Sequence, residues 1–268
     1  QRQREGSVRD ISVESAAIRA AAIAGVPSAT VVTASSDTTQ LGAPYMIVTH
    51  VDGETTARRI LRDDEYQHAR RALPAQLADA LVKIHSIDPA TVPGITDTDQ
   101  VEQYRDVLDT LDEPHPTFEL TLRWLEAHRP PISVDAVVHG DFRLGNVMVD
   151  RDGLQAVLDW ELVHLGDPME DLGWMCVKSW RFGSPKPVAG VADYQEMFDG
   201  YEAAGGRRVH ADTVRWWEVL GTLKWGIMCI MQANAHLTGV SRSHELAAIG
   251  RRVCETEHDL FLALEGRW

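Results

Sequence analysis

The stretch that decides the fold reads His139-Gly140-Asp141-Phe142-Arg143-Leu144-Gly145-Asn146, then Asp159-Trp160-Glu161, then Gly166-Asp167-Pro168 and Asp171. Apolar runs over 146–149 and 154–158 predict two short strands, and the intervening Asp-Arg-Asp-Gly has turn composition. Such a hairpin brings Asn146 and Asp159 close together, with Asp141 on the loop that leads in. Two carboxylates and one amide suit a hard cation such as Mg²⁺ and leave a carboxylate to take a proton.

The loop around Asp141 resembles the catalytic loop of the kinase-like phosphotransferases, in which an Asn follows the Asp by five residues. Protein kinases have an Arg at the position of Gly140 and an Asp-Phe-Gly run where this chain has Asp159-Trp160-Glu161. The variant found here is similar to the aminoglycoside phosphotransferase and choline kinase-like branch, which phosphorylates small molecules. The likeness can be followed, more weakly, over residues 10–175.

This resemblance implies an α+β, protein-kinase-like, two-lobed fold. Residues 1–52 would be the remainder of a small β-rich N-lobe, incomplete here, and residues 53–268 a mainly helical C-lobe. No Gly-rich phosphate loop precedes position 10. Either upstream residues are absent from the sequence given, or the chain lacks that part of the nucleotide site, and we favour the first reading.

The family implies a role for each residue of the central stretch. Asp141 would accept or orient the proton of an acceptor hydroxyl, while Asn146 and Asp159 would hold Mg²⁺ on the phosphates of ATP. His139 would fix the loop by hydrogen bonding, and Asp171 would brace it from a neighbouring helix.

Two further supporting residues allow structural readings as well. Arg143 either contacts the acceptor or a phosphate, or is a surface arginine. Asp167 is either a supporting residue of the site or the N-cap of the helix that begins at Pro168.

The resemblance also places the ATP site. The adenine edge would be read by the backbone C=O of Thr49 and N–H of Val51, with Val48 lining the pocket behind. Glu14 would pair with the family's strand Lys, although an acidic residue in a first helical turn also favours the helix dipole. Arg2 occupies the position of the family's basic residue, or is simply an exposed basic terminus.

Periodicity and breakers predict the remaining elements. Leu73, Leu77, Leu81 and Ile84 form one apolar helical face, with Pro74 in the first turn of that helix. His85 is expected to end this helix without a chemical role. Other predicted helices cover 12–24, 117–128 and 214–237, predicted strands cover 29–33 and 45–51, and 90–116 is expected to be loop with a short helix.

The composition is that of an ordinary folded protein, with 268 residues of which 44% are hydrophobic and 25% charged. The net charge of −14 argues against a nucleic-acid partner. Between His139 and Met175 there are eight acidic and two basic residues, a field that attracts Mg²⁺ and cationic substrates. A solvated acidic surface explains the overall charge equally well.

The cysteines and the apolar segments indicate the compartment. Cys176, Cys229 and Cys254 are far apart and form no metal-type pair, which favours a reduced, cytoplasmic setting. No signal peptide is visible, and the apolar region 214–237 is too polar for a membrane span, so we expect no membrane partner.

These observations favour ATP- and Mg²⁺-dependent phosphorylation of a hydroxyl on a small molecule. The acceptor stays open between an aminocyclitol, choline or another amine and a hydroxy acid or acyl derivative, and the oligomeric state is unreadable. A catalytically inactive nucleotide-binding module is the alternative, and metal-dependent hydrolysis at the same carboxylates is a third possibility.

Overall fold

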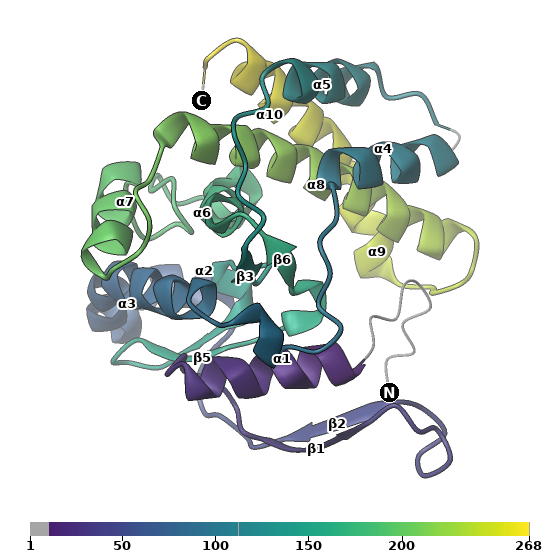
Figure 1. Cartoon of the computed structure of the whole chain (residues 1–268). Coiled ribbons are helices and arrows are strands. Elements are labelled where there is room, and N and C mark those ends of the chain that lie inside the picture. The colour runs from purple at the N-terminus through teal and green to yellow at the C-terminus, as the bar shows by residue number, and fades with distance from the viewer. Residues whose placement is uncertain (1–10, 112, 268) are drawn as a thin grey trace. The chain divides into compact units, whose positions relative to one another are not determined.

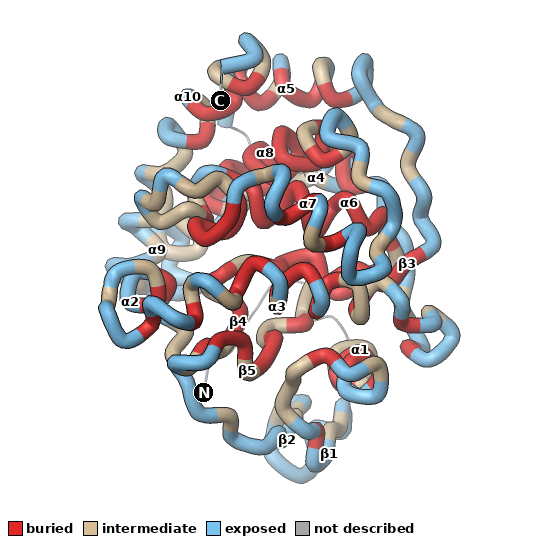
Figure 2. The backbone as a smooth tube through the Cα atoms, turned by 90° about the vertical axis from the view of Figure 1, so that its left-hand side faces the viewer, coloured by how far each residue is buried: buried red, intermediate tan, exposed pale blue. Residues whose placement is uncertain are grey.

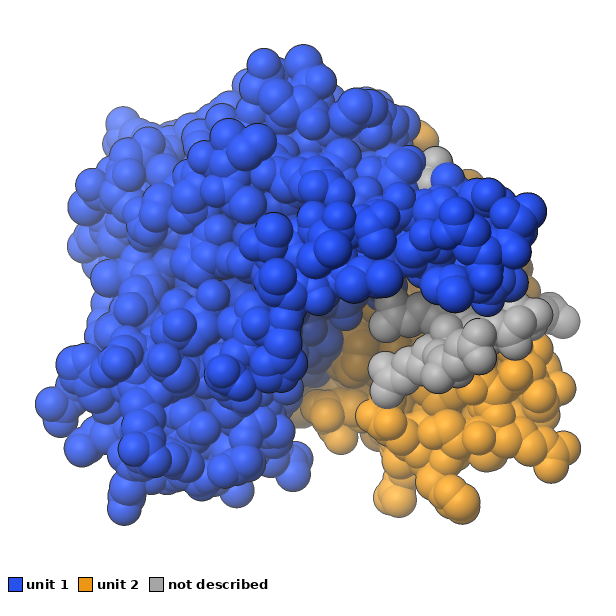
Figure 3. Space-filling view, turned by 90° about the horizontal axis from the view of Figure 1, so that it is seen from below, with its two compact units in different colours: residues 1–97, 133–210 blue, residues 98–132, 211–268 orange. Residues whose placement is uncertain are grey.

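The computed structural model describes residues 11–111 and 113–267 and divides the chain into two compact units. Unit 1 comprises residues 1–97 and 133–210, and unit 2 comprises residues 98–132 and 211–268 (Figure 3). Each unit is therefore assembled from two separate stretches of sequence. The residues of the central stretch all belong to unit 1.

The described part of unit 1 begins with a helix beside a two-stranded sheet (Figure 1). Helix α1 (Ile11–Ile23) packs on β1 (Val31–Ser35), which pairs antiparallel with β2 (Tyr45–Val48). The alanine-rich run buries Ala17 and Ala21 completely, because small side chains allow the helix to approach the sheet closely.

The chain leaves β2 and attaches directly to the central hairpin. Glu54 and Val149 exchange two backbone hydrogen bonds, of 2.8 and 3.0 Å. Gly53 precedes this bridge at φ 151°, and a Cβ there would contact the Met148 side chain and the Val149 carbonyl. The segment after β2 is thereby fixed to the strand that follows Asn146.

Two helices follow, α2 (Ala57–Arg62) and α3 (Gln67–His85). The predicted apolar face of α3 is confirmed, with its four members at most 1% exposed. The placement of Pro74 in the first turn is wrong, because α3 begins at Gln67 and Pro74 lies inside it. An internal proline costs about 3 kcal/mol, and burial of the leucines on either side of it offsets this cost.

The second part of unit 1 contains two antiparallel strand pairs. Strand β3 (Ala136–Val138) pairs with β6 (His164–Gly166), and β4 (Val147–Val149) pairs with β5 (Leu154–Val157). Helices α6 (Pro168–Cys176) and α7 (Tyr194–Ala203) follow. All nine residues of α6 are buried (Figure 2), so this helix is an interior support for the loop that precedes β4.

Short 3₁₀ helices make the remaining connections of unit 1: η1 (Asp64–Tyr66), η2 (Pro89–Thr91), η3 (Leu144–Asn146), η4 (Trp160–Leu162) and η5 (Lys178–Arg181). Two of these, η3 and η4, flank the β4–β5 hairpin and therefore carry or adjoin the predicted site residues.

Unit 2 is helical in its described residues. It comprises α4 (Gln100–Thr110), α5 (Pro116–Ala127), α8 (Ala211–Leu237), α9 (His244–Ile249), η6 (Gly250–Arg252) and α10 (Val253–Leu264). The indole N–H of Trp216 donates to the Leu125 carbonyl at 3.0 Å and ties α8 to α5. Among the described residues, no helix is long and apolar enough to cross a membrane.

Most sequence-predicted elements are present with shifted ends. The strand predicted over 29–33 lies at 31–35, and the one predicted over 45–51 stops at Val48. The predicted short helix in 90–116 is α4, and the predicted hairpin is β4–β5.

Candidate active site

The loop that begins at His139 is held by a buried carboxylate. Asp171, in α6, accepts the backbone N–H of His139 at 2.8 Å and that of Gly140 at 2.9 Å. Gly140 lies at φ +77°, and a Cβ there would collide with the Leu162 carbonyl. The chain can therefore make this turn only with glycine at position 140.

The Asp171 carboxylate has a third partner on α3. His85 Nε2 lies 3.1 Å from Asp171 Oδ2, and His85 Nδ1 lies 2.8 Å from the hydroxyl of Tyr201 on α7. Burial alone would raise the pKa of Asp171, but the bonds from His85 and from the loop lower it below its usual range. The Asp171 carboxylate is therefore ionised, and its hydrogen bonds connect α6 with α3 and, through His85, with α7.

His139 uses both ring nitrogens within the loop. Its Nδ1 accepts the backbone N–H of Asp141 at 3.2 Å, so the proton is on Nε2, which donates to the Leu158 carbonyl at 3.0 Å. Burial lowers the pKa of His139, although Asp171 and Asp141 act in the opposite direction. A neutral imidazole that is hydrogen-bonded at both nitrogens positions the loop and has no free nitrogen for proton transfer.

Asp141 receives three side-chain donors. Arg143 Nε donates to Oδ1 at 3.0 Å, Trp174 Nε1 donates to the same oxygen at 2.7 Å, and Asn146 Nδ2 donates to Oδ2 at 2.5 Å. An ionised carboxylate has about four acceptor positions. Within the described part of the chain, the position left open is on Oδ2.

Arg143 is not a free surface side chain, because it is held against both Asp141 and Trp180. Its guanidinium carbon lies 4.6 Å from the centroid of the Trp180 ring, and its side chain is 23% exposed. Gly145 leaves the room for it, since a Cβ there would collide with the Arg143 guanidinium. A cation is thus fixed beside the carboxylate expected to face the acceptor.

Asn146 and Asp159 are adjacent across the ends of the hairpin. The Asn146 carbonyl accepts the N–H of Leu158 at 2.8 Å, directly before Asp159. Asp159 itself takes left-handed backbone angles, φ 60° and ψ 63°, which cost a non-glycine residue roughly 1–2 kcal/mol. Strain of this kind is often found at functional positions.

These two residues fit a magnesium ion. The amide nitrogen of Asn146 is engaged with Asp141, which leaves its Oδ1 as a ligand. The Asp159 carboxylate has no protein donor among the described residues. Mg²⁺ usually takes one or two protein oxygens and completes its shell with phosphates and water. No described group of three or more His, Cys, Asp or Glu side chains could hold a metal by itself.

The Asp167 side chain accepts hydrogen bonds from two backbone N–H groups. It caps α6 by accepting the Met169 N–H at 2.8 Å, and it also accepts the Ser133 N–H at 3.0 Å. Burial raises its pKa, against the effect of these two bonds. In this structure Asp167 fixes the start of the helix that carries Asp171.

The predicted adenine-binding residues are at the end of β2. Thr49 bonds back to Thr30 through both its N–H and its hydroxyl, each at 2.9 Å. The Thr49 carbonyl and the Val51 N–H carry no partner within the described residues, and Val48 is 41% exposed. Backbone groups at this position are thus available to a ligand.

Two other residues of the predicted ATP site remain expectations. Glu14 lies in the first turn of α1 and is partly exposed. Arg2 lies outside the described residues.

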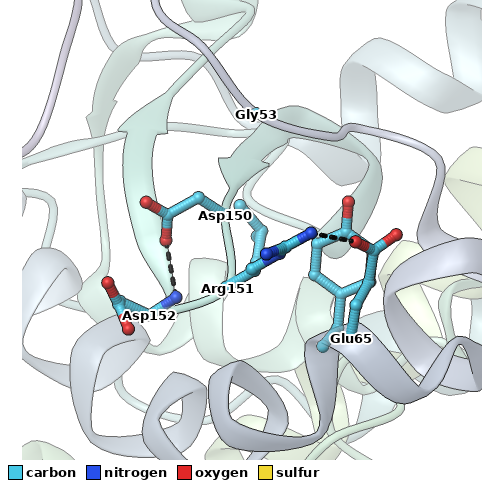
Figure 4. A pocket seen from close by; sticks show the side chains of 7 residues that line it. Gly53, Glu65, Asp150, Arg151 and Asp152 are labelled. Atoms are coloured by element: carbon cyan, nitrogen blue, oxygen red, sulfur yellow. Dashed lines mark hydrogen bonds and ion pairs between the residues drawn. The ribbon is translucent and has the colours of Figure 1, made fainter.

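A separate pocket of about 410 Å³ lies at the turn of the β4–β5 hairpin (Figure 4). Its lining residues are Gly53, Glu65, Tyr66, Val149, Asp150, Arg151 and Asp152. Arg151 bonds to Glu65 there at 3.2 Å. Asn146 and Asp159 adjoin the opposite end of the hairpin, so this pocket contains none of the predicted site residues.

Sequence reasoning missed three members of the site. It gave His85 no chemical role, whereas in the structure the His85 ring is hydrogen-bonded to Asp171. It did not assign Trp174 or Trp180, which contact Asp141 and Arg143. The position of Trp174 three residues after Asp171, one turn along the same helix, was the available signal.

Comparison with known proteins bears on these assignments. A model described as the phosphotransferase enzyme family matches residues 1–210. Acyl-CoA dehydrogenase family member 10 of Mus musculus is 32% identical over 185 residues, which are 64% of this chain and 17% of the mouse protein. Family member 11 of Gallus gallus is 29% identical over 154 residues, 52% of this chain and 19% of the chicken protein. The chain thus spans less than a fifth of either relative.

Solved structures share the fold. A candidate aminoglycoside phosphotransferase of Ralstonia eutropha has a TM-score of 0.78 and 23% identity, covering 96% of this chain and 83% of that one. A choline/ethanolamine kinase family protein of Mesorhizobium loti has a TM-score of 0.68 and 18% identity, covering 97% and 80%. An aminoglycoside phosphotransferase mutant in complex with AMP-PNP and hygromycin B has a TM-score of 0.63 and 17% identity, covering 92% and 82%. The predicted kinase-like α+β fold is confirmed.

Proposed function

Because the chain belongs to the phosphotransferase enzyme family, we propose that it transfers the γ-phosphate of ATP to a hydroxyl group of a small molecule. The observation that carries the proposal is the direct contact between Asp141 and Asn146, on a loop whose start is fixed by Asp171. Phosphoryl transfer depends mainly on positioning and electrostatic stabilisation, and a rigid loop with an ionised support provides both.

In this proposal, Asp141 orients the acceptor hydroxyl through Oδ2 and takes its proton as the phosphoryl group transfers. Asn146 and Asp159 would hold Mg²⁺, which when bound neutralises charge on the phosphates. The backbone of Thr49 and Val51, with Val48 and Glu14, would form the adenine and phosphate side of the site, and Arg2 would add a cation there.

Two acceptor classes have support. The acidic surroundings of the loop favour a cationic alcohol such as an aminocyclitol or choline. The names of the mouse and chicken relatives, acyl-CoA dehydrogenase family members, favour a hydroxyl on an acyl thioester, and the fixed Arg143 is compatible with such an anionic acceptor. The two classes carry charges of opposite sign, so a panel with acceptors of each class distinguishes them.

The test is nucleotide consumption by the full-length protein with Mg-ATP or Mg-GTP and a panel of aminoglycosides, choline, hydroxy acids and hydroxyacyl thioesters. Acceptor-dependent formation of ADP and a phosphorylated product supports the proposal. Nucleotide binding without turnover on any acceptor identifies the inactive nucleotide-binding module. Phosphate release that needs no acceptor identifies a hydrolase. The reduced cytoplasmic setting is the compartment we propose for this reaction.

A further inference from the structure

Four side chains, Asp141 among them, form a closed ring of contacts that meets at one carboxylate oxygen of Asp141. Trp174 and Arg143 both donate to Oδ1, at 2.7 and 3.0 Å. The Arg143 guanidinium stacks over Trp180, and the Trp180 and Trp174 rings pack with their centroids 5.2 Å apart. Each member of the ring is therefore in contact with the next.

The ring comes from three different elements of unit 1. Asp141 and Arg143 lie on the loop, Trp174 on α6 and Trp180 on η5. Trp174 is 3% exposed and Trp180 is 5% exposed, so the support is an interior one. A buried indole has few rotamers available once both faces are packed, and its N–H direction is fixed with it.

From this arrangement we propose that Trp174 is a positioning residue for phosphoryl transfer, which holds Asp141 so that Oδ2, rather than Oδ1, faces the acceptor hydroxyl. This inference rests on the proposed function. Oδ1 has both acceptor positions filled by Arg143 and Trp174, whereas Oδ2 receives only Asn146. A hydroxyl proton can thus be accepted only at Oδ2.

Arg143 alone does not secure this orientation. It lies on the same loop as Asp141, two residues along the chain, so the two side chains can shift together with the loop. The indole N–H of Trp174 belongs to a packed helix that also carries Asp171. The Asp141 carboxylate is therefore fixed to α6, the same helix that holds the start of the loop through Asp171.

The first test is Trp174→Phe, which removes the N–H and retains an aromatic ring. The expected result is a fall in kcat of about 10- to 100-fold, since small displacements of a reacting group have effects of this order, with KM for Mg-ATP within about twofold of wild type. Trp216→Phe is the matched control, because it also removes the hydrogen bond of a buried indole, in this case one to a backbone carbonyl in unit 2. The kcat of this control should stay within about twofold of wild type.

The second test reads the bond directly and does not depend on the Trp174→Phe variant. In ¹⁵N-tryptophan-labelled wild-type protein, one indole N–H should resonate downfield because its acceptor is a carboxylate. Asp141→Asn should shift that signal, and Asp167→Asn, which alters a carboxylate that caps the same helix, should not.

The outcomes separate the two claims. If the wild-type protein transfers phosphate and Trp174→Phe keeps full kcat, the positioning role is overturned and the proposed function stands. An indole signal that does not change in Asp141→Asn has the same consequence. A wild-type protein that phosphorylates no acceptor overturns the proposed function and this inference with it. A loss of kcat in Trp174→Phe but not in Trp216→Phe, together with the indole shift in Asp141→Asn, supports both the proposed function and the positioning role.

Discussion

The Nε2 of His139 donates to the carbonyl of Leu158 across 3.0 Å. This bond connects the start of the loop that carries Asp141 to the residue directly before Asp159. The proposed proton acceptor and the proposed metal ligand are therefore held by one buried, neutral imidazole.

Replacement of His139 by Asn should destabilise the protein by about 2–3 kcal/mol, because two buried hydrogen bonds and part of the ring's packing are lost. Urea unfolding at neutral pH measures this free energy. His50→Asn, at an exposed side chain, is the control and should change stability by less than about 0.5 kcal/mol. A His139 variant as stable as wild type would contradict the role assigned to this ring.

The same residue predicts a pH dependence of stability. Burial lowers the pKa of folded His139, whereas in the unfolded chain a histidine titrates near about 6.5. Below that pH the unfolded state takes up a proton that the folded state rejects, so stability present above about pH 6.5 is lost as the pH falls toward the folded pKa. His139→Asn should flatten this slope, and an unchanged slope would show that another group is responsible.

Asp171→Asn should cost roughly 3 kcal/mol, since it removes a charge that accepts two loop N–H groups and the His85 bond. The folded pKa of Asp171 is lowered, so its stabilisation is present above about pH 4 and lost as the pH falls through the folded pKa. Acid unfolding followed by circular dichroism should therefore be shallower in the variant. An equally steep acid transition would argue against Asp171 as its source.

Two glycines of the loop should respond differently to alanine. A Cβ at Gly140 collides with the Leu162 backbone, whereas a Cβ at Gly145 collides with the end of the Arg143 side chain. Gly140→Ala should lose several degrees in Tm or fail to fold, because backbone cannot yield and φ is positive. Gly145→Ala should fold normally and lose transfer activity as Arg143 is displaced. Equal effects on Tm at both positions would contradict this distinction.

Asp159 should separate stability from metal binding. Asn tolerates left-handed backbone angles better than Ala, so Asp159→Asn should unfold within about 0.5 kcal/mol of wild type, while Asp159→Ala should lose about 1 kcal/mol. Both variants should bind Mg-ATP at least about tenfold more weakly, since the proposed metal ligand loses its charge. Isothermal titration with and without Mg²⁺ measures this, and unchanged affinity would exclude Asp159 as a ligand.

Local patterns were sufficient to predict the loop, the hairpin and the apolar face of α3. Each depends on residues close in sequence, such as the turn at Asp150 to Gly153 and the regular spacing of the α3 leucines. The start of α3 was misplaced because a proline usually marks a first turn, and only the burial of this helix shows why Pro74 is tolerated inside it.

The ring around Asp141 and the His85 bond to Asp171 could not be predicted fully from local patterns, since the spacing of Asp171 and Trp174 places them on one helical face but does not name their partners. The ring and the bond join residues 33 and 86 positions apart, and no local pattern specifies which distant side chain fills a given acceptor. Tryptophan and histidine are common in cores, so their presence alone predicts only burial.

The most direct test of the proposed function compares wild type with Asp141→Ala on one accepted acceptor, with phosphorylated product and Mg-ATP affinity measured on the same preparations. We predict that the variant forms no product above background and binds Mg-ATP within about threefold of wild type, because Asp141 serves the acceptor hydroxyl and Asn146 and Asp159 serve the metal. An Asp141→Ala protein that transfers phosphate at the wild-type rate would contradict the account.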